Sequence, residues 1–151
     1  RSSFSRRNPL NWFFYLFVRH YGYKYGFQIF TTKIGMGFYI GHFGNVIING
    51  EAVIGNNVNV SPGVVIGLVN TGKRKGVPRV GNNVWIGTNA IIVGKVCIGN
   101  NVMIAPGSFV NFDVPDFSIV KGNPGVCYDG QGVEGYINNM WDVCLKKIKT
   151  L

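Results

Sequence analysis

Branched apolar residues recur at every sixth position through the middle of the chain. They form two runs: Ile48, Ile54, Val60 and Ile66, then Val80, Ile86, Ile92, Ile98, Ile104 and Val110. A small or apolar residue follows four positions after many of them, and Gly often comes directly after them. An α-helix needs apolar spacing near 3.6 and an amphipathic strand needs a spacing of 2, so this pattern fits neither.

A six-residue period predicts short strands that stack in register, with a corner after each strand. Three units make one coil of about 18 residues, whose branched side chains stack on those of the next coil. Pairs of Asn at regular positions suit the left-handed backbone that corners demand: Asn56 and Asn57, Asn82 and Asn83, Asn100 and Asn101. We therefore predict an all-β solenoid. A β-sandwich, the disfavoured alternative, would show alternation interrupted by loops of variable length.

The repeat divides the 151 residues into three parts. Residues 1–30 are basic and aromatic and predict a helix that begins near Asn8 and Pro9. Residues 31–125 form the solenoid, which a loop over residues 67–79 interrupts. Residues 126–151 form a C-terminal extension with a predicted short amphipathic helix, based on Val133, Ile137, Met140 or Trp141, Cys144 and Ile148.

The segment 9–30 leaves two interpretations open. Its aromatic residues and its basic residues Arg19 and Lys24 suit a cap over the open end of the solenoid, which we favour. They also suit a peripheral contact with a membrane interface. No apolar stretch reaches the roughly 20 residues of a spanning helix.

Charge and cysteine content narrow the partners. The formal net charge is +9, which favours phosphorylated cofactors, nucleic acid or anionic lipid. No nucleic-acid recognition motif is present, so we expect no nucleic-acid partner. Three Cys residues without CxxC spacing predict neither a disulfide framework nor a Cys-based zinc site. We expect a cytoplasmic protein, with the inner membrane as the site of any peripheral contact.

Two breaks in the repeat indicate where chemistry is located. From Ile40 to Ile48 the spacing is eight residues, and His42 lies in this longer corner. A neutral imidazole is well suited to take a proton from a hydroxyl, so His42 is the predicted general base. The second break, from Ile66 to Val80, contains the basic loop. His20, the other histidine, is expected to be structural or interfacial.

The repeats carry a family resemblance. The runs VIGNNVNVSPGVVIG, VGNNVWIGTNAIIVGKVCIGNNVMIAPGSFV and DVPDFSIVKGNPG resemble the hexapeptide-repeat acyltransferases, which fold as left-handed parallel β-helices and assemble as trimers. The run TTKIGMGFYIGHFGNVIINGEAVIG is similar to the serine acetyltransferase branch, particularly to relatives that acetylate capsular or exopolysaccharide sugars. The resemblance implies a homotrimer that uses acetyl-CoA and no metal.

The resemblance also implies a mechanism. The segment IGHFGNVIIN matches the catalytic segment of the family, so His42 would deprotonate an acceptor hydroxyl that attacks the acetyl-CoA thioester directly. Backbone amides would stabilise the oxyanion. Trp85 matches an aromatic residue near the acceptor in galactoside and maltose acetyltransferases, although an exposed interface residue is an equal alternative. The group that orients His42 is not identified. Glu51, the single acid between residues 31 and 112, could approach His42 across a corner or contact the acceptor, although a solvated carboxylate is the favoured interpretation.

The expected acceptor follows from three departures from the serine acetyltransferase pattern. Phe27, Gly41 and Val77 stand where that branch has two acids and a second histidine. A zwitterionic serine left without partners for its charges would bind poorly. We therefore expect transfer to a hydroxyl of a sugar in a capsular polysaccharide, an exopolysaccharide or a precursor. Serine O-acetylation in cysteine biosynthesis is the alternative, and a structural β-helix is the non-enzymatic one.

CoA phosphates would need cations, and pantetheine would need small residues along the coils. The candidate cations are Lys73, Arg74, Arg79 and Lys121, and the candidate small residues are Gly67, Gly87, Ala105 and Gly107. Carbonic anhydrases on this fold use three histidine ligands for their metal, and a chain with two histidines excludes that set.

Overall fold

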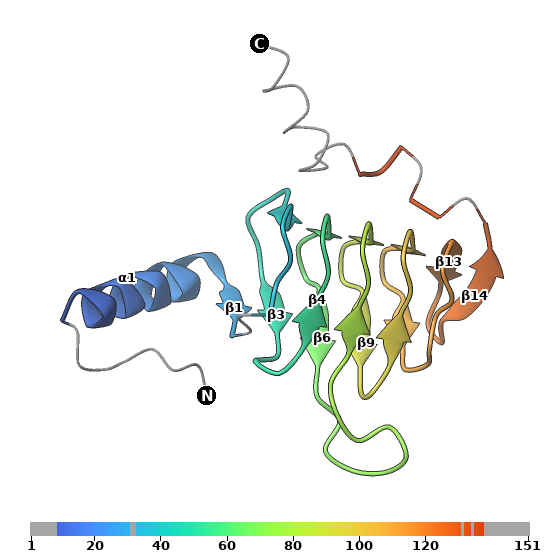
Figure 1. Ribbon diagram of the computed structural model, residues 1–151, viewed down its shortest axis with the longest axis horizontal. Helices are drawn as coiled ribbons and strands as arrows, with labels where there is room; N and C mark the ends of the chain where they lie inside the picture. Colours follow the sequence, from blue (N-terminus) through green and yellow to red (C-terminus); the bar gives the residue numbers. More distant parts are fainter. Residues whose placement is uncertain (1–8, 31–32, 131, 134, 138–151) are drawn as a thin grey trace.

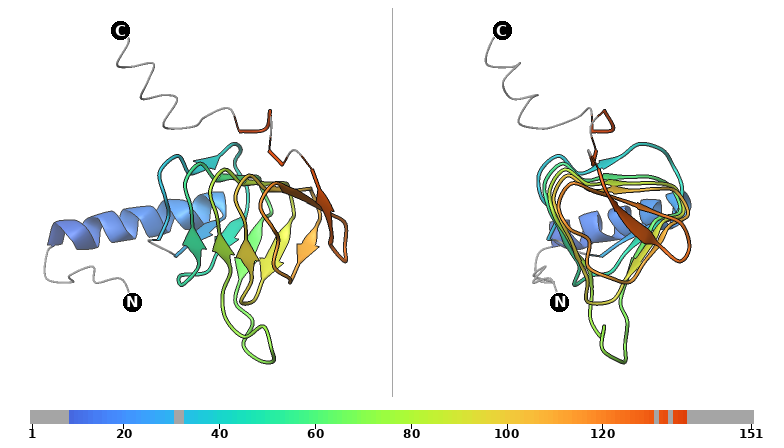
Figure 2. Two further views of the ribbon diagram at one scale, coloured as in Figure 1. Left: turned by 45° about the vertical axis from the view of Figure 1, so that its right-hand side comes forward. Right: turned by 90° about the vertical axis from the view of Figure 1, so that its right-hand side faces the viewer.

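The computed structural model describes residues 9–30, 33–130, 132–133 and 135–137, and it contains a parallel β-helix preceded by one α-helix (Figure 1). Viewed along its long axis, the coils superpose as a triangle (Figure 2). Each side of the triangle is one sheet of short strands, in which every strand pairs with the equivalent strand of the next coil. The predicted all-β solenoid is therefore confirmed.

The first sheet has five strands, in the order β1 (Phe27–Ile29), β3 (Val46–Ile48), β6 (Val65–Gly67), β9 (Ile91–Val93) and β12 (Phe109–Val110). The second contains β4 (Val53–Ile54), β7 (Arg79–Val80) and β10 (Cys97–Ile98), with β7 in the middle. The third runs β2 (Tyr39–Ile40), β5 (Asn59–Val60), β8 (Trp85–Ile86), β11 (Met103–Ile104), β13 (Ser118–Lys121) and β14 (Val126–Asp129). Strand pairs are parallel except β13 with β14.

The core consists of the side chains that the six-residue period singles out. Ile48, Ile66, Ile86, Ile92 and Ile104 are each 0% exposed. Successive side chains in a strand point to opposite faces, so one residue of each short strand enters the core and its neighbour faces outward. The interior is therefore a stack of branched residues, each packed on the equivalent residue of the next coil.

The paired asparagines occupy the corners. The second member of each pair has a left-handed backbone: Asn57, Asn83 and Asn101 have φ between 53° and 55°. The first members form a ladder, in which the backbone N–H of Asn56 donates to Oδ1 of Asn82 at 2.8 Å and that of Asn82 donates to Oδ1 of Asn100 at 2.9 Å. Short polar side chains therefore satisfy backbone donors that a corner would otherwise leave unpaired.

Helix α1 (Pro9–Tyr25) begins where Pro at the first helical position predicts it. It extends beyond the first coil (Figure 1). Its large apolar side chains are exposed along its length, for example Trp12 at 58%, Phe13 at 61% and Val18 at 68%. It contacts the coils near its C-terminal end, where the ring of Tyr25 stacks on that of Phe43 with centroids 5.5 Å apart, and the cap stays a prediction. In the part of the chain that the structure describes, no helix is long and apolar enough to cross a bilayer.

The C-terminal extension starts with an element that the sequence analysis missed. Residues 126–129 form β14, which turns back antiparallel to β13. Val133 and Ile137 of the predicted helix are buried, but Val133 lies in a turn and Ile137 in no regular secondary structure. The remaining predicted helix positions, Met140, Trp141, Cys144 and Ile148, lie outside the described residues.

Candidate active site

The irregular corner between β2 and β3 carries His42, whose side chain is exposed. In later coils, the same corner of the triangle is formed by residues 61–63, 87–89 and 105–107. Gly44 lies in the same corner as His42 and has φ +150°. A Cβ added there would lie 2.8 Å from Cβ of Pro62 in the next coil. The absence of a side chain at Gly44 therefore lets the longer corner lie against the next coil.

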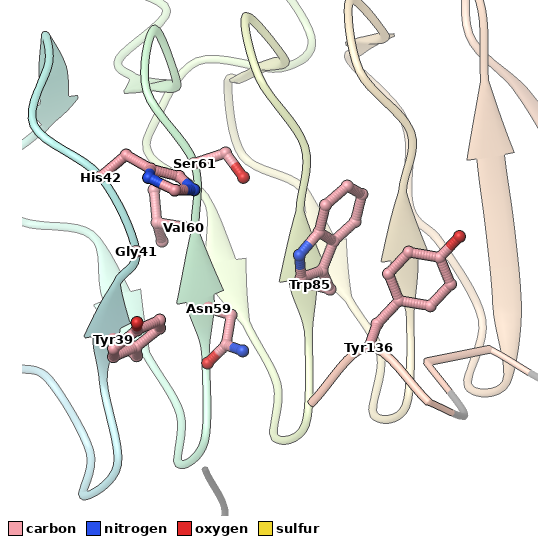
Figure 3. A pocket seen from close by; sticks show the side chains of 8 residues that line it. All are labelled: Tyr39, Gly41, His42, Asn59, Val60, Ser61, Trp85 and Tyr136. Atoms are coloured by element: carbon pink, nitrogen blue, oxygen red, sulfur yellow. The ribbon is translucent and has the colours of Figure 1, made fainter. Parts of the chain in front are cut away.

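A pocket of about 320 Å³ lies beside this corner, over the outer face of the third sheet. Its lining residues come from three successive coils and from the C-terminal segment (Figure 3): Tyr39, Gly41, His42, Asn59, Val60, Ser61, Trp85 and Tyr136. Tyr39, Asn59 and Trp85 occupy matched register positions in β2, β5 and β8. The β-helix therefore aligns three side chains in a row that begins on β2, the strand that leads into the corner of His42.

Two aromatic rings form one end of the pocket. The ring centroids of Trp85 and Tyr136 are 5.0 Å apart, and the ring planes are inclined at 48° (Figure 3). Trp85, predicted as an acceptor-site aromatic, does line the pocket with His42. Tyr136 was missed, because it enters only where the segment after β14 returns over the third sheet. Its nearest sequence signal is an aromatic residue in the Gly-rich stretch 130–136.

Asn59 is the second residue that the sequence analysis missed. Its side chain is 8% exposed, and its Oδ1 atom is buried without a hydrogen-bond partner. An unpaired buried polar atom is rare in folded proteins, because it loses its contacts with water and gains none. The available signal was a polar residue beside the core position Val60 in a strand that is otherwise apolar.

Glu51 lies at a different corner from His42. It follows β3, at the corner that leads to β4, where its backbone N–H donates to Oδ1 of Asn49 at 3.0 Å. Glu51 is exposed and is not among the residues that line the pocket. The sequence analysis allowed an approach to His42 across a corner, but the intervening strand β3 carries the chain along a whole side of the triangle. Among the described lining residues, none is a carboxylate or a lysine or arginine.

The candidate pantetheine residues are divided between two edges of the triangle. Gly87, Ala105 and Gly107 lie in the same column of corners as His42. An added Cβ at Gly87 would lie 2.7 Å from the backbone N of Pro106, so this column is closely packed backbone. Gly67 ends β6 and therefore lies at the corner from which the basic loop leaves.

The candidate phosphate-binding cations lie away from the pocket within one chain. The loop that carries Lys73 and Arg74 leaves the triangle between β6 and β7 (Figure 2), and Arg79 begins β7. Arg74 is already paired, with Nη1 2.9 Å from Oδ2 of Asp113. Lys121 ends β13, and its Nζ lies 6.0 Å from the ring centroid of Tyr128. None of these four residues lines the pocket that contains His42.

The Arg74 ion pair affects the protonation of Asp113. The backbone N–H of Cys97 donates to Oδ1 of Asp113 at 2.8 Å, and Arg74 binds the other carboxylate oxygen. The pKa of Asp113 is lowered, first by the hydrogen bond from Cys97 and then by that from Arg74. Both contacts favour the charged carboxylate. Arg74 therefore ties the loop to the solenoid.

Comparison with known proteins places this geometry among acetyltransferases. Residues 78–111 match the bacterial transferase hexapeptide family (six repeats). The chain is 41% identical to the serine acetyltransferase of Bacillus subtilis over 112 residues. This alignment covers 72% of this chain and 51% of that protein. The chain thus spans about half the length of this relative.

Solved structures give the same result. The serine acetyltransferase of Neisseria gonorrhoeae in complex with serine has a TM-score of 0.56 and 37% identity, covering 62% of this chain and 38% of that one. The serine acetyltransferase of Brucella abortus in complex with coenzyme A has a TM-score of 0.61 and 29% identity, covering 66% and 40%. The match to the hexapeptide transferase model and the similarity to serine acetyltransferases both imply a left-handed β-helix. These matches do not support the polysaccharide-acetylating branch.

Proposed function

We propose that the protein is an acetyl-CoA-dependent O-acetyltransferase of the serine acetyltransferase type, with His42 as its general base. The observation that carries the proposal is the position of His42, on the one lengthened corner of its column and inside the lining of a pocket. The homology to serine acetyltransferases supports acetyl transfer as the reaction.

In the proposed reaction, the neutral imidazole of His42 removes the proton from the acceptor hydroxyl. The oxygen attacks the thioester carbonyl of acetyl-CoA, and collapse of the tetrahedral intermediate breaks the carbon–sulfur bond. The departing CoA sulfur takes the proton back from the imidazolium, so atoms and charges balance. Backbone amides are the expected donors to the oxyanion.

We propose that acetyl-CoA lies along the column of corners that contains His42. Gly87, Ala105 and Gly107 would let the pantetheine arm approach the backbone. The basic loop lies at another edge of the same chain, so its cations would reach the phosphates only from a neighbouring subunit. A homotrimer, which the family resemblance implies, would supply such a neighbour.

The acceptor has two candidates. Serine is favoured by the curated relatives and by the serine complex of the Neisseria gonorrhoeae protein, so the alternative of the sequence analysis becomes the first proposal. A neutral hydroxyl compound such as a sugar is favoured by the pocket, whose described lining has no carboxylate, lysine or arginine to pair with a zwitterion. Phe27, Gly41 and Val77 leave this second candidate in place.

The test is thioester consumption from acetyl-CoA with serine and with a panel of mono- and oligosaccharides. We expect His42→Ala to lower turnover by about 10²–10⁴-fold. His20→Ala is the matched control, because His20 lies on α1 and does not line the pocket. Turnover retained in His42→Ala would refute the role of His42 as the general base. Turnover with sugars and not with serine would make a sugar the first candidate acceptor.

We also propose that α1 lies on an anionic membrane surface. Its exposed Trp12, Tyr15 and Tyr23 are residues that favour the lipid–water interface. The first 50 residues contain no Asp or Glu. They contain six basic residues, namely Arg1, Arg6, Arg7, Arg19, Lys24 and Lys33. Anionic lipid is therefore the partner of complementary charge. Cytoplasmic location, with this contact at the inner membrane, stays a prediction.

A further inference from the structure

We propose that Asn59 recognises the acceptor, by accepting a hydrogen bond through Oδ1 from a second donor group beside the hydroxyl that faces His42. The inference rests on the proposed function. It defines the acceptor class as hydroxyl compounds with a neighbouring N–H or O–H donor, namely amino alcohols and vicinal diols. Serine and sugars both belong to this class, and simple monohydric alcohols do not.

The first argument is the contrast between Asn59 and the asparagines of the corners. Those asparagines are bonded between coils; for example, Nδ2 of Asn57 donates to Oδ1 of Asn83 at 2.9 Å. Oδ1 of Asn59 is equally buried but has no partner. A strand position of this kind readily accepts an apolar residue, so a buried amide oxygen without a partner indicates a ligand that pairs with it.

The second argument is the position of the side chain. Val58 and Val60 are core residues, so Asn59 between them faces outward, into the pocket that His42 lines (Figure 3). Its register partners on either side are Tyr39 and Trp85. An acceptor whose reacting hydroxyl lies at His42 would therefore place its next group above the middle of this row.

The third argument is the chemistry of the remaining lining. Val60 and Gly41 offer no polar side chain, Tyr39 and Ser61 offer hydroxyls, and the aromatic pair Trp85 and Tyr136 offers mainly apolar ring surface. A carbonyl oxygen accepts from hydroxyl and ammonium groups alike. Loss of such a buried acceptor should reduce discrimination between substrates with and without the donor.

The test compares Asn59→Ala with Asn82→Ala, a matched variant in the asparagine ladder. We expect Asn59→Ala to raise the acceptor KM by about tenfold and to leave the KM for acetyl-CoA unchanged. Its Tm should equal or exceed that of the wild type, because an unpaired buried group has been removed. Asn82→Ala should lower the Tm and leave the acceptor KM unchanged, because its side-chain Oδ1 accepts from the backbone N–H of Asn56 and its Nδ2 donates to Oδ1 of Asn100.

Two further arms sharpen the test. The wild type should prefer the acceptor over a matched monohydric compound that lacks the second donor, and Asn59→Ala should lose that preference. Asn59→Asp should shift preference toward amino alcohols, because a carboxylate binds an ammonium more strongly than a hydroxyl.

The outcomes separate this inference from the proposed function. If the wild type is active and Asn59→Ala has the same acceptor KM and the same substrate preference, the role of Asn59 alone is overturned. A Tm loss in Asn59→Ala like that of Asn82→Ala, with unchanged preference, assigns the residue to the fold and also overturns it. A wild type that acetylates no hydroxyl compound overturns the proposed function and this inference together.

Discussion

The β-helix and α1 are both rich in large apolar residues, but the β-helix buries these residues and α1 exposes them. Ile86 and Ile104 in the β-helix are 0% exposed, whereas Phe13 in α1 is 61% exposed. In the β-helix, each coil is the packing partner of the next, so the repeat buries its own apolar face. Helix α1 touches the coils at β1 and Phe43 and leaves most of its large apolar residues exposed. Apolar composition predicts burial only where the chain also supplies the surface that covers it.

The largest difference should be seen when one side chain is truncated in each region. We expect Ile104→Ala to reduce the free energy of unfolding by about 2–5 kcal/mol, because it leaves a cavity among coils that cannot collapse around it. Phe13→Ala should change the same quantity by no more than about 0.5 kcal/mol, because the ring has little packing to lose. Urea unfolding of both variants measures the difference. Equal losses would mean that α1 is packed in the protein in solution.

A smaller effect should appear when the surface of α1 is tested against lipid. We expect the triple variant Trp12→Ser, Phe13→Ser and Phe17→Ser to lose about tenfold or more in binding to phosphatidylglycerol vesicles, because these side chains would no longer enter the interface. Binding to phosphatidylcholine vesicles should be weaker for the wild type and should fall less, because the cations of the chain have no anionic partner there. Cosedimentation measures both.

The control for the lipid experiment is Tyr128→Ser, since Tyr128 is 52% exposed and lies in β14 at the other end of the solenoid. It should bind vesicles like the wild type. If the triple variant binds equally well, α1 is not the membrane contact. If instead it changes the size of the assembly in solution, α1 covers a second copy of the chain.

The smallest effect should come from the exposed ion pair of the β-helix. The lowered pKa of Asp113 means that the folded protein favours the carboxylate, so this stabilisation is present above the ordinary Asp pKa and is lost as pH falls through the lowered pKa. Asp113→Asn should therefore flatten part of the acid dependence of stability. Because Arg74 and Asp113 are 43% and 60% exposed, the change at neutral pH should be roughly 1 kcal/mol or less.

Urea midpoints measured from neutral to acidic pH test this last prediction. Asp129→Asn is the control, because that carboxylate is exposed and lies in the terminal strand β14. An identical acid dependence in the wild type and Asp113→Asn would refute a contribution from the pair.

The six-residue period was sufficient to predict the solenoid, its core and its corners. Each repeat carries its own instructions: a branched residue for the interior and an asparagine with left-handed backbone for the corner. The same reasoning identified His42, because an insertion in a strict repeat is visible along the chain. These features are local, since a few consecutive residues determine each one.

The rest of the site was decided by tertiary structure. The burial of Asn59 depends on Tyr39 and Trp85, which are one coil away on either side, and Tyr136 reaches Trp85 only after the chain has reversed in β14. Glu51 lies only nine residues after His42, but it is carried to another corner of the triangle. The sequence by itself determined which residues build each coil, whereas only the stacked coils decided which outward side chains meet, because those neighbours are set by strand register rather than by sequence distance.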